Sequence, residues 1–380
     1  MTIADPPLQP SPGGSPRERF RRRLAERPLL VDGALGTLLF SRGVPQRACL
    51  EELVVRQPAM VVAAHQEYLE AGAELIETLS FGANRLRLDA WGLGGEVGQL
   101  NRRAARLARE AREVSGRDAL IGGSIGPLGP PLPAATRVPE ATARSVFREQ
   151  IEGLLEGGAD ALVLETFSDL AQLVLAVEEA RRAADVPVLA SITFGEELVL
   201  ADGSSPSTAA AALAAAGADV VGVNCGAGPA ASLDALEAMG RPAADGPERS
   251  IMPNAGLSQR LEGRFVYAAS AAYFGTVTPR LLDASARVVG GCCGTTPGHT
   301  AAMRAALDAL SPIDSAAPPT AASPTAAPPT AVPVSIAVAR STSLADRAAV
   351  PAAGEPPPPT RLAALLAAGQ FAVSVEIDPP

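Results

Sequence analysis

The chain has 380 residues, 47% of them hydrophobic and only 3% aromatic, so it can bury a large core that must be mostly aliphatic. Its formal net charge of −9 argues against a nucleic-acid partner and against binding to an anionic membrane surface. It contains no lysine, which excludes Schiff-base chemistry, and its four cysteines are too few for a disulfide framework in so long a chain.

Residues 1–19 are rich in proline and glycine and then in arginine, and we expect them to form a disordered tail. The segment lacks the apolar stretch of a secretory signal, and no run of about 18 apolar residues marks a membrane span. We therefore expect a cytoplasmic protein, in whose reducing surroundings the thiols stay free.

Between residues 20 and 311, short runs of β-forming residues alternate with longer stretches that have helical character. The eight predicted strands are Leu29–Val31, Glu74–Thr78, Leu120–Ser124, Ala161–Leu164, Val188–Thr193, Val220–Asn224, Ile251–Pro253 and Arg287–Gly290. The predicted helices include Pro58–Ala71, Gln99–Val114, Thr142–Glu156, Leu170–Ala184, Ser207–Ala216, a shorter Pro279–Ala286, and Pro297–Leu310.

Three helix-to-strand turns nearly repeat one another, with Gly72, Gly158 and Gly217 at the left-handed position that ends a helix. Repeated βα units with continuously apolar strands indicate a parallel sheet that is covered on both faces. Eight such units predict an α/β fold, a (β/α)8 TIM barrel. An open doubly wound sheet is the alternative, but no glycine-rich dinucleotide fingerprint follows the first strand.

The composition changes after residue 311. Residues 312–359 are rich in Ala, Pro, Thr and Ser, which is typical of a disordered linker. Residues 360–380 regain an apolar pattern and end in a strand-like run. A lone strand buries nothing, so this segment either docks on the barrel or is the truncated start of a second domain, which is the interpretation we favour.

Functional side chains of a TIM barrel lie at the C-terminal ends of its strands. The residues in those positions are Asp32, Glu77, Thr78, Ser124, Gly126, Glu165, Thr166, Thr193, Phe194, Asn224, Cys225, Asn254, Cys292 and Cys293. Three cysteines would therefore converge at one mouth of the barrel.

Three soft sulfur ligands and an open fourth position are typical of a catalytic zinc that binds a thiol substrate. Zinc deprotonates such a thiol near neutral pH, and three further thiolates keep its sulfur electron-rich enough to attack an activated methyl group. The two histidines, His65 and His299, fall in predicted helices, which argues against a hydrolytic His-rich zinc site.

Other interpretations of the cysteines stay open. Cys225 alone could be an ordinary buried residue, and Cys292 and Cys293 could form a vicinal disulfide. Cys49 is expected to be structural or a surface thiol. Glycines on both sides of the vicinal pair permit the turn that would aim both sulfurs at one metal ion.

Asp32 precedes a glycine-containing loop whose backbone N–H groups can bind an anion, although Asp32 and Glu165 could also be helix N-caps or first-turn acids. A carboxylate for an ammonium group, N–H groups for a carboxylate and a metal ion for a thiol would together bind a thiol amino acid.

Four motifs together resemble the homocysteine S-methyltransferase family: Asp32–Thr37, Glu165–Phe167, Val223–Gly226 and Gly290–Thr295. The resemblance covers about residues 20–310. It implies zinc-dependent transfer of a methyl group from a small-molecule donor to the sulfur of homocysteine, which gives methionine. The segment Thr193–Ser205 departs from the family pattern, so the donor stays open among S-methylmethionine, S-adenosylmethionine, a betaine and a methylfolate-linked carrier.

The resemblance also implies roles for individual residues. Cys225, Cys292 and Cys293 would be the zinc ligands and, with Glu165, the catalytic residues. Asp32 and Glu165 would bind homocysteine through their side chains. The backbone of Gly33 and Ala34 would receive its carboxylate, and Asn224 would support this binding.

The last segment, residues 360–380, resembles the start of methylenetetrahydrofolate reductase, with Glu376 in place of a catalytic acid in a Glu-x-x-Pro-Pro context. This implies the N-terminal part of a bifunctional enzyme, with FAD expected only for the missing reductase domain. The alternative functions are a structural-zinc barrel that serves as a one-carbon binding scaffold for a fused reductase, and a redox pair at Cys292–Cys293. Homo-oligomerisation is left open.

Overall fold

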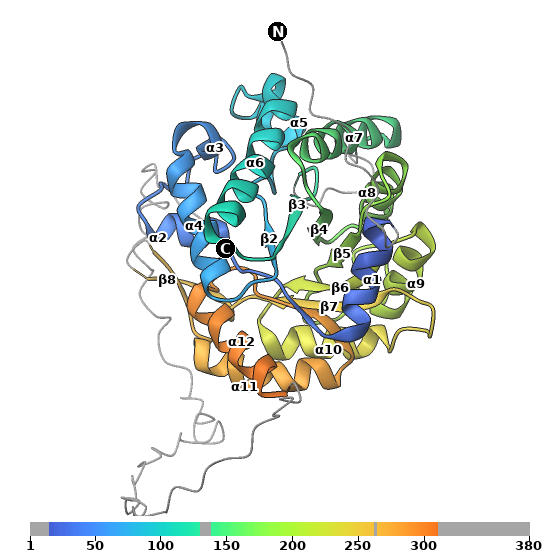
Figure 1. The fold of residues 1–380 in the computed structure, drawn as a ribbon. Helices are drawn as coiled ribbons and strands as arrows, with labels where there is room; N and C mark the ends of the chain where they lie inside the picture. The colour runs from blue at the N-terminus through green and yellow to red at the C-terminus, as the bar shows by residue number, and fades with distance from the viewer. Residues whose placement is uncertain (1–14, 130–137, 262–263, 311–380) are drawn as a thin grey trace, which may run out of the picture. The chain divides into compact units, whose positions relative to one another are not determined.

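The computed structural model describes residues 15–129, 138–261 and 264–310 (Figure 1). Its strands are β1 (Leu29–Leu30), β2 (Leu75–Glu77), β3 (Leu120–Ile125), β4 (Ala161–Phe167), β5 (Val188–Ile192), β6 (Val220–Cys225), β7 (Glu248–Pro253), β8 (Ser258–Leu261), β9 (Arg264–Tyr267) and β10 (Ala286–Val289). The predicted linker, the reductase-like segment and residues 1–14 of the predicted tail lie outside the described residues.

Helices follow most of the strands. They are α1 (Pro16–Glu26), α2 (Leu35–Ser41), α3 (Leu53–Arg56), α4 (Pro58–Glu70), α5 (Arg85–Asp89), the short 3-10 helix η1 (Gly94–Glu96), α6 (Val97–Ser115), α7 (Glu140–Gly157), α8 (Leu170–Ala183), α9 (Pro206–Ala216), α10 (Pro229–Met239), α11 (Ala271–Asp283) and α12 (Pro297–Leu310). None of the helices in the described part of the chain has the length and apolar composition of a transmembrane span.

Eight parallel strands form one sheet in the order β1-β10-β7-β6-β5-β4-β3-β2. A further parallel bridge between Val31 and Leu75 joins the two outer strands, so the sheet closes into a barrel with helices around it (Figure 1). The predicted (β/α)8 barrel is confirmed, and each of its eight strands overlaps a strand expected from the sequence.

Aliphatic side chains fill the barrel, as the low aromatic content requires. The interior cluster is made by one or two residues from most strands: Leu29, Val31, Leu75, Ala161, Val163, Leu189, Val220, Met252 and Val288. Phe20 and Leu24 of α1 belong to the same cluster, so this helix closes the N-terminal end of the barrel, which we call the base. Full burial of each Val, Leu, Met or Phe side chain in this cluster stabilises the fold by about 1.5–3 kcal/mol.

Helix α1 begins with a capping box, in which Ser15 and Glu18 bond reciprocally across the first turn. The helix starts at Pro16, so the domain boundary predicted at residue 20 falls inside it. Its arginines reach carboxylates at the base: Arg17 lies 2.5 Å from Asp219, and Arg23 lies 3.0 Å from Glu74.

Three acids directly precede strands in the repeated turns, and each accepts a hydrogen bond from the backbone of a neighbouring strand. Glu74 accepts from Leu30 N (3.3 Å), Asp160 from Ile121 N (2.9 Å) and Asp219 from Val188 N (3.0 Å). Each acid also pairs with at least one arginine. The repeat in the sequence therefore builds a ring of neutralised carboxylates around the base.

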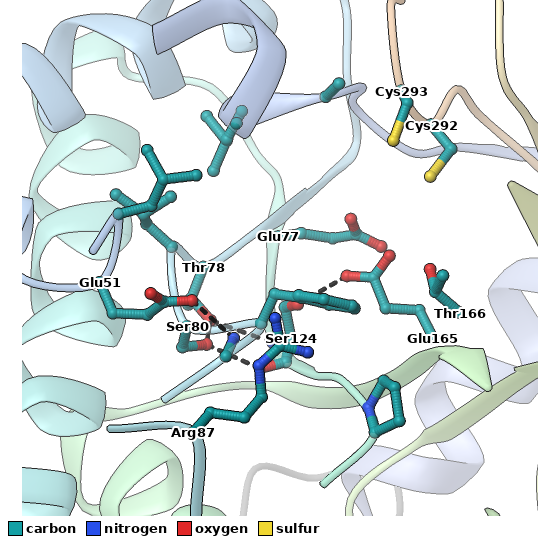
Figure 2. A pocket seen from close by; sticks show the side chains of 18 of the residues that line it. Glu51, Glu77, Thr78, Ser80, Arg87, Ser124, Glu165, Thr166, Cys292 and Cys293 are labelled. Atoms are coloured by element: carbon teal, nitrogen blue, oxygen red, sulfur yellow. Dashed lines mark hydrogen bonds between the residues drawn. The ribbon is translucent and has the colours of Figure 1, made fainter. Parts of the chain in front are cut away.

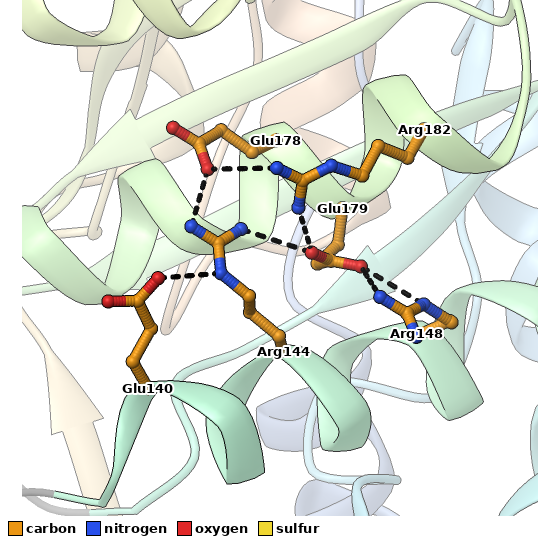
Figure 3. Close-up of polar contacts among 6 residues, drawn as sticks. All are labelled: Glu140, Arg144, Arg148, Glu178, Glu179 and Arg182. Atoms are coloured by element: carbon orange, nitrogen blue, oxygen red, sulfur yellow. Dashed lines mark hydrogen bonds and ion pairs between the residues drawn. The ribbon is translucent and has the colours of Figure 1, made fainter.

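An ion-pair network joins α7 to α8 around the buried Glu179 (Figure 3). Its carboxylate accepts from Arg144 at 3.1 Å and from Arg148 at 2.6 Å, and it also pairs with Arg182. Burial raises the pKa of this carboxyl, but the hydrogen bonds from Arg148 and Arg144 outweigh burial and hold the pKa below its usual value.

The structure corrects the short helix predicted at Pro279–Ala286. Helix α11 runs from Ala271, after the N-cap Ser270, to Asp283, and Ala286 begins β10. Pro279 indicated a helix start because proline favours the first turn, yet it lies inside the helix. Because proline has no backbone N–H, the helical hydrogen bond from position 279 to the carbonyl of Gly275 is missing. Burial of Phe274, Val277 and Leu281 keeps the helix continuous there.

Candidate metal and substrate site

The three predicted cysteine ligands meet at the C-terminal end of the barrel, which we call the mouth. The sulfur atoms of Cys225, Cys292 and Cys293 all lie within 4.8 Å of one another. Cys225 ends β6, and the vicinal pair follows β10 in the loop that leads to α12. All four cysteines are free thiols, and these three form a group that can hold a metal ion.

Backbone geometry aims the vicinal pair at one point. Cys292 N donates to Pro253 O (2.8 Å) and Ala255 N donates to Cys293 O (2.9 Å), which ties the loop to the end of β7. Gly294 has a left-handed φ of 80°, and Gly291 is so close to Thr295 that a methyl group there would lie 2.4 Å from its Oγ1. The glycines singled out in the sequence are thus sterically required.

Hydrogen bonds among the sulfurs favour a single thiolate. Those from Cys292 and Cys293 lower the pKa of Cys225 to about 3. The same interaction with Cys225 raises the pKa of Cys293 to about 12 and that of Cys292 as well. Cys225 also has an unusual left-handed backbone, with φ of 63°, of the kind that concentrates at functional sites.

Three carboxylates gather beside the cysteines at the mouth. Asp32, at the end of β1, is fully buried, and its Oδ2 accepts from the backbone N of Glu77 at 3.0 Å. Glu165, in β4, accepts from Ser124 Oγ at 2.6 Å. Figure 2 shows the carboxylates of Glu77 and Glu165 facing each other, with Cys292 and Cys293 nearby.

Burial raises the pKa of all three carboxyl groups. The pKa of Glu165 rises to about 7, and those of Asp32 and Glu77 rise well above their ordinary values. The negative charge of Glu165 adds to the effect on both neighbours. Within the described part of the chain, none of the three forms an ion pair with an arginine.

Asn224 links the carboxylates to the sulfur cluster. Its Oδ1 accepts from Thr166 N (2.8 Å), and its Nδ2 donates to Thr166 Oγ1 (2.7 Å), to Glu165 Oε2 (3.4 Å) and towards Cys292 Sγ (3.8 Å). Thr166 adopts a left-handed φ of 62° to make this contact. A single amide therefore fixes the ends of β4 and β6 relative to each other.

The loop after Asp32 is hydrogen-bonded within the protein, whereas the sequence suggested that its backbone N–H groups would be free for a ligand. Ala34 N, expected to receive a substrate carboxylate, donates to Thr295 Oγ1 at 3.2 Å. A methyl group on Gly33 would lie 2.5 Å from the same oxygen. The alternative roles as N-caps are wrong, because α2 has Ala34 at its N-cap and α8 has Asp169.

A cavity of about 1040 Å³ opens between these groups and the surface. Glu77, Glu165, Cys292 and Cys293 line it, together with an aromatic and aliphatic wall that includes Phe40, Leu50, Phe81, Leu86, Trp91 and Leu128. Its volume is at the upper end of what small-molecule sites usually offer. The Arg87 guanidinium lies 5.2 Å from the centre of the Phe81 ring and brings a positive charge to this wall.

The remaining predicted groups lie outside the cluster of three sulfurs. Cys49 is buried beside the cavity wall, with its Sγ 3.5 Å from Glu51 Oε2, and burial raises its pKa to about 11. His65 is buried in α4, and His299 in α12 bonds to Ala269 O through Nε2 at 3.0 Å.

Two residues at the mouth received no role from the sequence. Glu77 stood in the list of strand ends, and the strand-end rule that selected Glu165 applied equally to it. Tyr267 belongs to the antiparallel β8–β9 hairpin, which follows β7 and was not predicted. Its ring packs on Gly294, and the hairpin sequence carried no signal for that contact.

Comparison with known proteins identifies the family. Residues 29–307 match the family model described as homocysteine S-methyltransferase. The chain is 33% identical over 308 residues to methionine synthase of Mycobacterium tuberculosis, with 75% of this chain aligned to 25% of that protein. It thus spans about a quarter of that relative's length.

Other relatives are matched along most of their length. Betaine–homocysteine S-methyltransferase 1 of Mus musculus is 28% identical, with 82% of this chain aligned to 79% of the relative. The Escherichia coli homocysteine methyltransferase MmuM, in an oxidized form, superposes with a TM-score of 0.65 at 26% identity over 77% of this chain and 99% of that one. A metallated form of the same enzyme gives a TM-score of 0.63. The predicted methyltransferase class is confirmed, and the chain belongs to the homocysteine S-methyltransferase family.

Proposed function

We propose that this protein transfers a methyl group from a small-molecule donor to the sulfur of homocysteine, with one Zn²⁺ ion held by Cys225, Cys292 and Cys293. The observation that carries the proposal is the convergence of three sulfur atoms within 4.8 Å beside a large cavity. Ligation by three thiolates leaves one position of a tetrahedral ion for a substrate thiol.

The three sulfur ligands suit zinc both in their chemistry and in their spacing. Three sulfurs bound to one tetrahedral zinc at about 2.3 Å would lie about 3.8 Å apart, within the span of the cluster. Cys292 and Cys293 line the cavity, so a ligand in it can reach the open position. When bound, the ion would supply the Lewis acidity that keeps a substrate thiol deprotonated near neutral pH.

The residues of the chain bind and orient the substrates. The carboxylates of Asp32 and Glu165 would hold the ammonium group of homocysteine, and the Gly33–Ala34 backbone would receive its carboxylate after Ala34 N exchanges its bond to Thr295. The Asn224 amide contacts both Glu165 and Cys292, so it fixes the carboxylate relative to the sulfur. The apolar wall excludes water from the reacting sulfur. In the transfer, the sulfur–methyl bond forms as the donor–methyl bond breaks, and the electron pair of the broken bond stays with the methyl donor.

The donor is decided by experiment. Zinc-loaded protein is incubated with homocysteine and, in turn, S-methylmethionine, S-adenosylmethionine, glycine betaine and a methylfolate-linked carrier, and methionine is quantified. We expect methionine with one of these donors and its loss in Cys292→Ser, together with loss of bound zinc by metal analysis. Unchanged activity in Cys292→Ser would contradict the proposal.

The structural-zinc scaffold is the weaker hypothesis. A purely structural site is closed by four protein ligands, whereas the cluster in the described part of the chain has three. Cys49, which could have been the fourth, bonds to Glu51 instead. Zinc content that falls in Cys49→Ala would revive that hypothesis.

A further inference from the structure

Glu77 lies at the mouth beside Asp32 and Glu165, and it has no assigned role so far. It ends β2, lines the cavity beside Glu165, and has a buried Oε1 with no hydrogen-bond partner among the described residues. Its backbone N supports Asp32, so the two acids are fixed next to each other. Asp32 is fully buried, and its Oδ1 likewise has no partner.

The acceptors of the three acids divide into two groups. One oxygen of Asp32 and one of Glu165 are held by the chain, through Glu77 N and Ser124 Oγ. Among the residues that the structure describes, Asp32 Oδ1 and Glu77 Oε1 lack a donor, and Glu165 Oε2 has only the long 3.4 Å contact from Asn224. Each acid therefore presents one poorly satisfied oxygen, and buried acceptors without donors are costly.

An α-ammonium group has the matching chemistry. It carries three N–H donors and one positive charge, which suits three separate carboxylate oxygens. Within the described residues no arginine forms an ion pair with these acids, so a positively charged ligand can supply the charge that favours their ionised form. A thiol without an ammonium group would bring neither the positive charge nor the three N–H donors to these oxygens.

We propose that Glu77 is a specificity-determining residue that binds the substrate ammonium group together with Asp32 and Glu165, and so makes the site select thiols that carry a free α-ammonium. The inference rests on the proposed function, because it concerns the same substrate. It predicts that charge at position 77 matters for amino-acid thiols and is irrelevant, or even unfavourable, for thiols that lack the amine.

Binding, measured without turnover, tests this inference. Zinc-loaded wild type and Glu77→Gln are titrated by calorimetry with homocysteine and with 4-mercaptobutanoate, which keeps the thiol and the carboxylate but lacks the amine. We expect Glu77→Gln to bind homocysteine roughly 10- to 100-fold more weakly, since a hydrogen bond to a charged group is lost. Its affinity for 4-mercaptobutanoate should be unchanged or higher. Glu77→Asp should recover part of the homocysteine affinity, and the exposed Glu70→Gln is the control.

Three results would overturn the inference: equal weakening for both ligands, no weakening for either, or no homocysteine binding by the wild type. Metal content and thermal melting of each variant show whether Glu77→Gln is folded and loaded. If it is not, Glu77→Asp, whose carboxylate is one methylene shorter, should still bind homocysteine more weakly than the wild type does, with its affinity for 4-mercaptobutanoate unchanged. The proposed function fails separately, if the wild type binds homocysteine but forms methionine with none of the donors.

Discussion

Glu179 in the helical layer and Glu165 at the barrel mouth are both buried glutamates, 1% and 8% exposed, yet their pKa values shift in opposite directions. Three arginines surround Glu179, whereas Glu165 meets Ser124, Asn224 and two other acids. The ring of acids at the base resembles Glu179 in this respect. In the described part of the chain, the carboxylates of the helical layer and the base thus pair with arginines, whereas the three at the mouth do not, and we propose that the ligand supplies the positive charge there.

The largest expected effect is at the base. In Asp219→Ala, Arg17 and Arg181 lose a carboxylate that is fully buried, and Val188 N loses its acceptor. We expect a loss of about 3 kcal/mol in the free energy of unfolding by urea denaturation. Methyl transfer per folded molecule should not change. A loss below about 0.5 kcal/mol would show that the base does not depend on these pairs.

The second test compares the pH dependence of the two glutamates. Because the pKa of Glu165 is raised from 4.5 to about 7, its contribution to stability is present at low pH and is lost as pH rises through about 7. In metal-free protein, the free energy of unfolding should therefore fall between pH 5 and 8 by about 2 kcal/mol less in Glu165→Gln than in the wild type.

Glu179 should behave in the opposite way. Its lowered pKa means that its contribution is present above the unfolded value of 4.5 and is lost as pH falls through its folded value. Glu179→Gln should therefore reduce stability at pH 7 and flatten the acid side of the profile. Equal pH slopes for the two variants would remove the distinction between the regions.

A third, smaller effect concerns how the mouth is held in place. Gly294→Ala puts a methyl group 2.1 Å from Cγ of Tyr267 at a left-handed φ of 80°, and we expect a loss of about 1–2 kcal/mol in stability. Zinc affinity, measured by chelator competition, should fall with it. Adding Tyr267→Ala should relieve the steric part, and a double variant as impaired as the single one would rule out the ring contact as the cause.

The smallest effect calibrates the others. Arg109 and Glu113 form an exposed pair at 3.7 Å on α6. Glu113→Gln should change the free energy of unfolding by less than about 0.5 kcal/mol, since such pairs are weak in water. A larger change would mean that arginine–carboxylate pairs stabilise this fold even without burial.

The sequence predicted the barrel well because each strand is a short apolar run bounded by turn signals. It also placed Cys225, Cys292 and Cys293 at one mouth, since the ends of parallel strands share an edge. It could not predict the β8–β9 hairpin, whose position depends on packing against the cysteine loop. It also missed the engagement of Ala34 N by Thr295, 261 residues later in the chain.

The long-range contacts of α1 at the base have a consequence for the order of folding. Arg17 bonds to Asp219, 202 residues away, and Arg287 bonds to Leu24 O across 263 residues. These contacts need β6 and β10 in place, and long-range contacts form late because closing such loops is entropically costly. Of the described helices, α1 is synthesised first, yet it is expected to be among the last to dock. Until then its arginines stay exposed to proteases, which makes cleavage in α1 a marker of unfinished barrels.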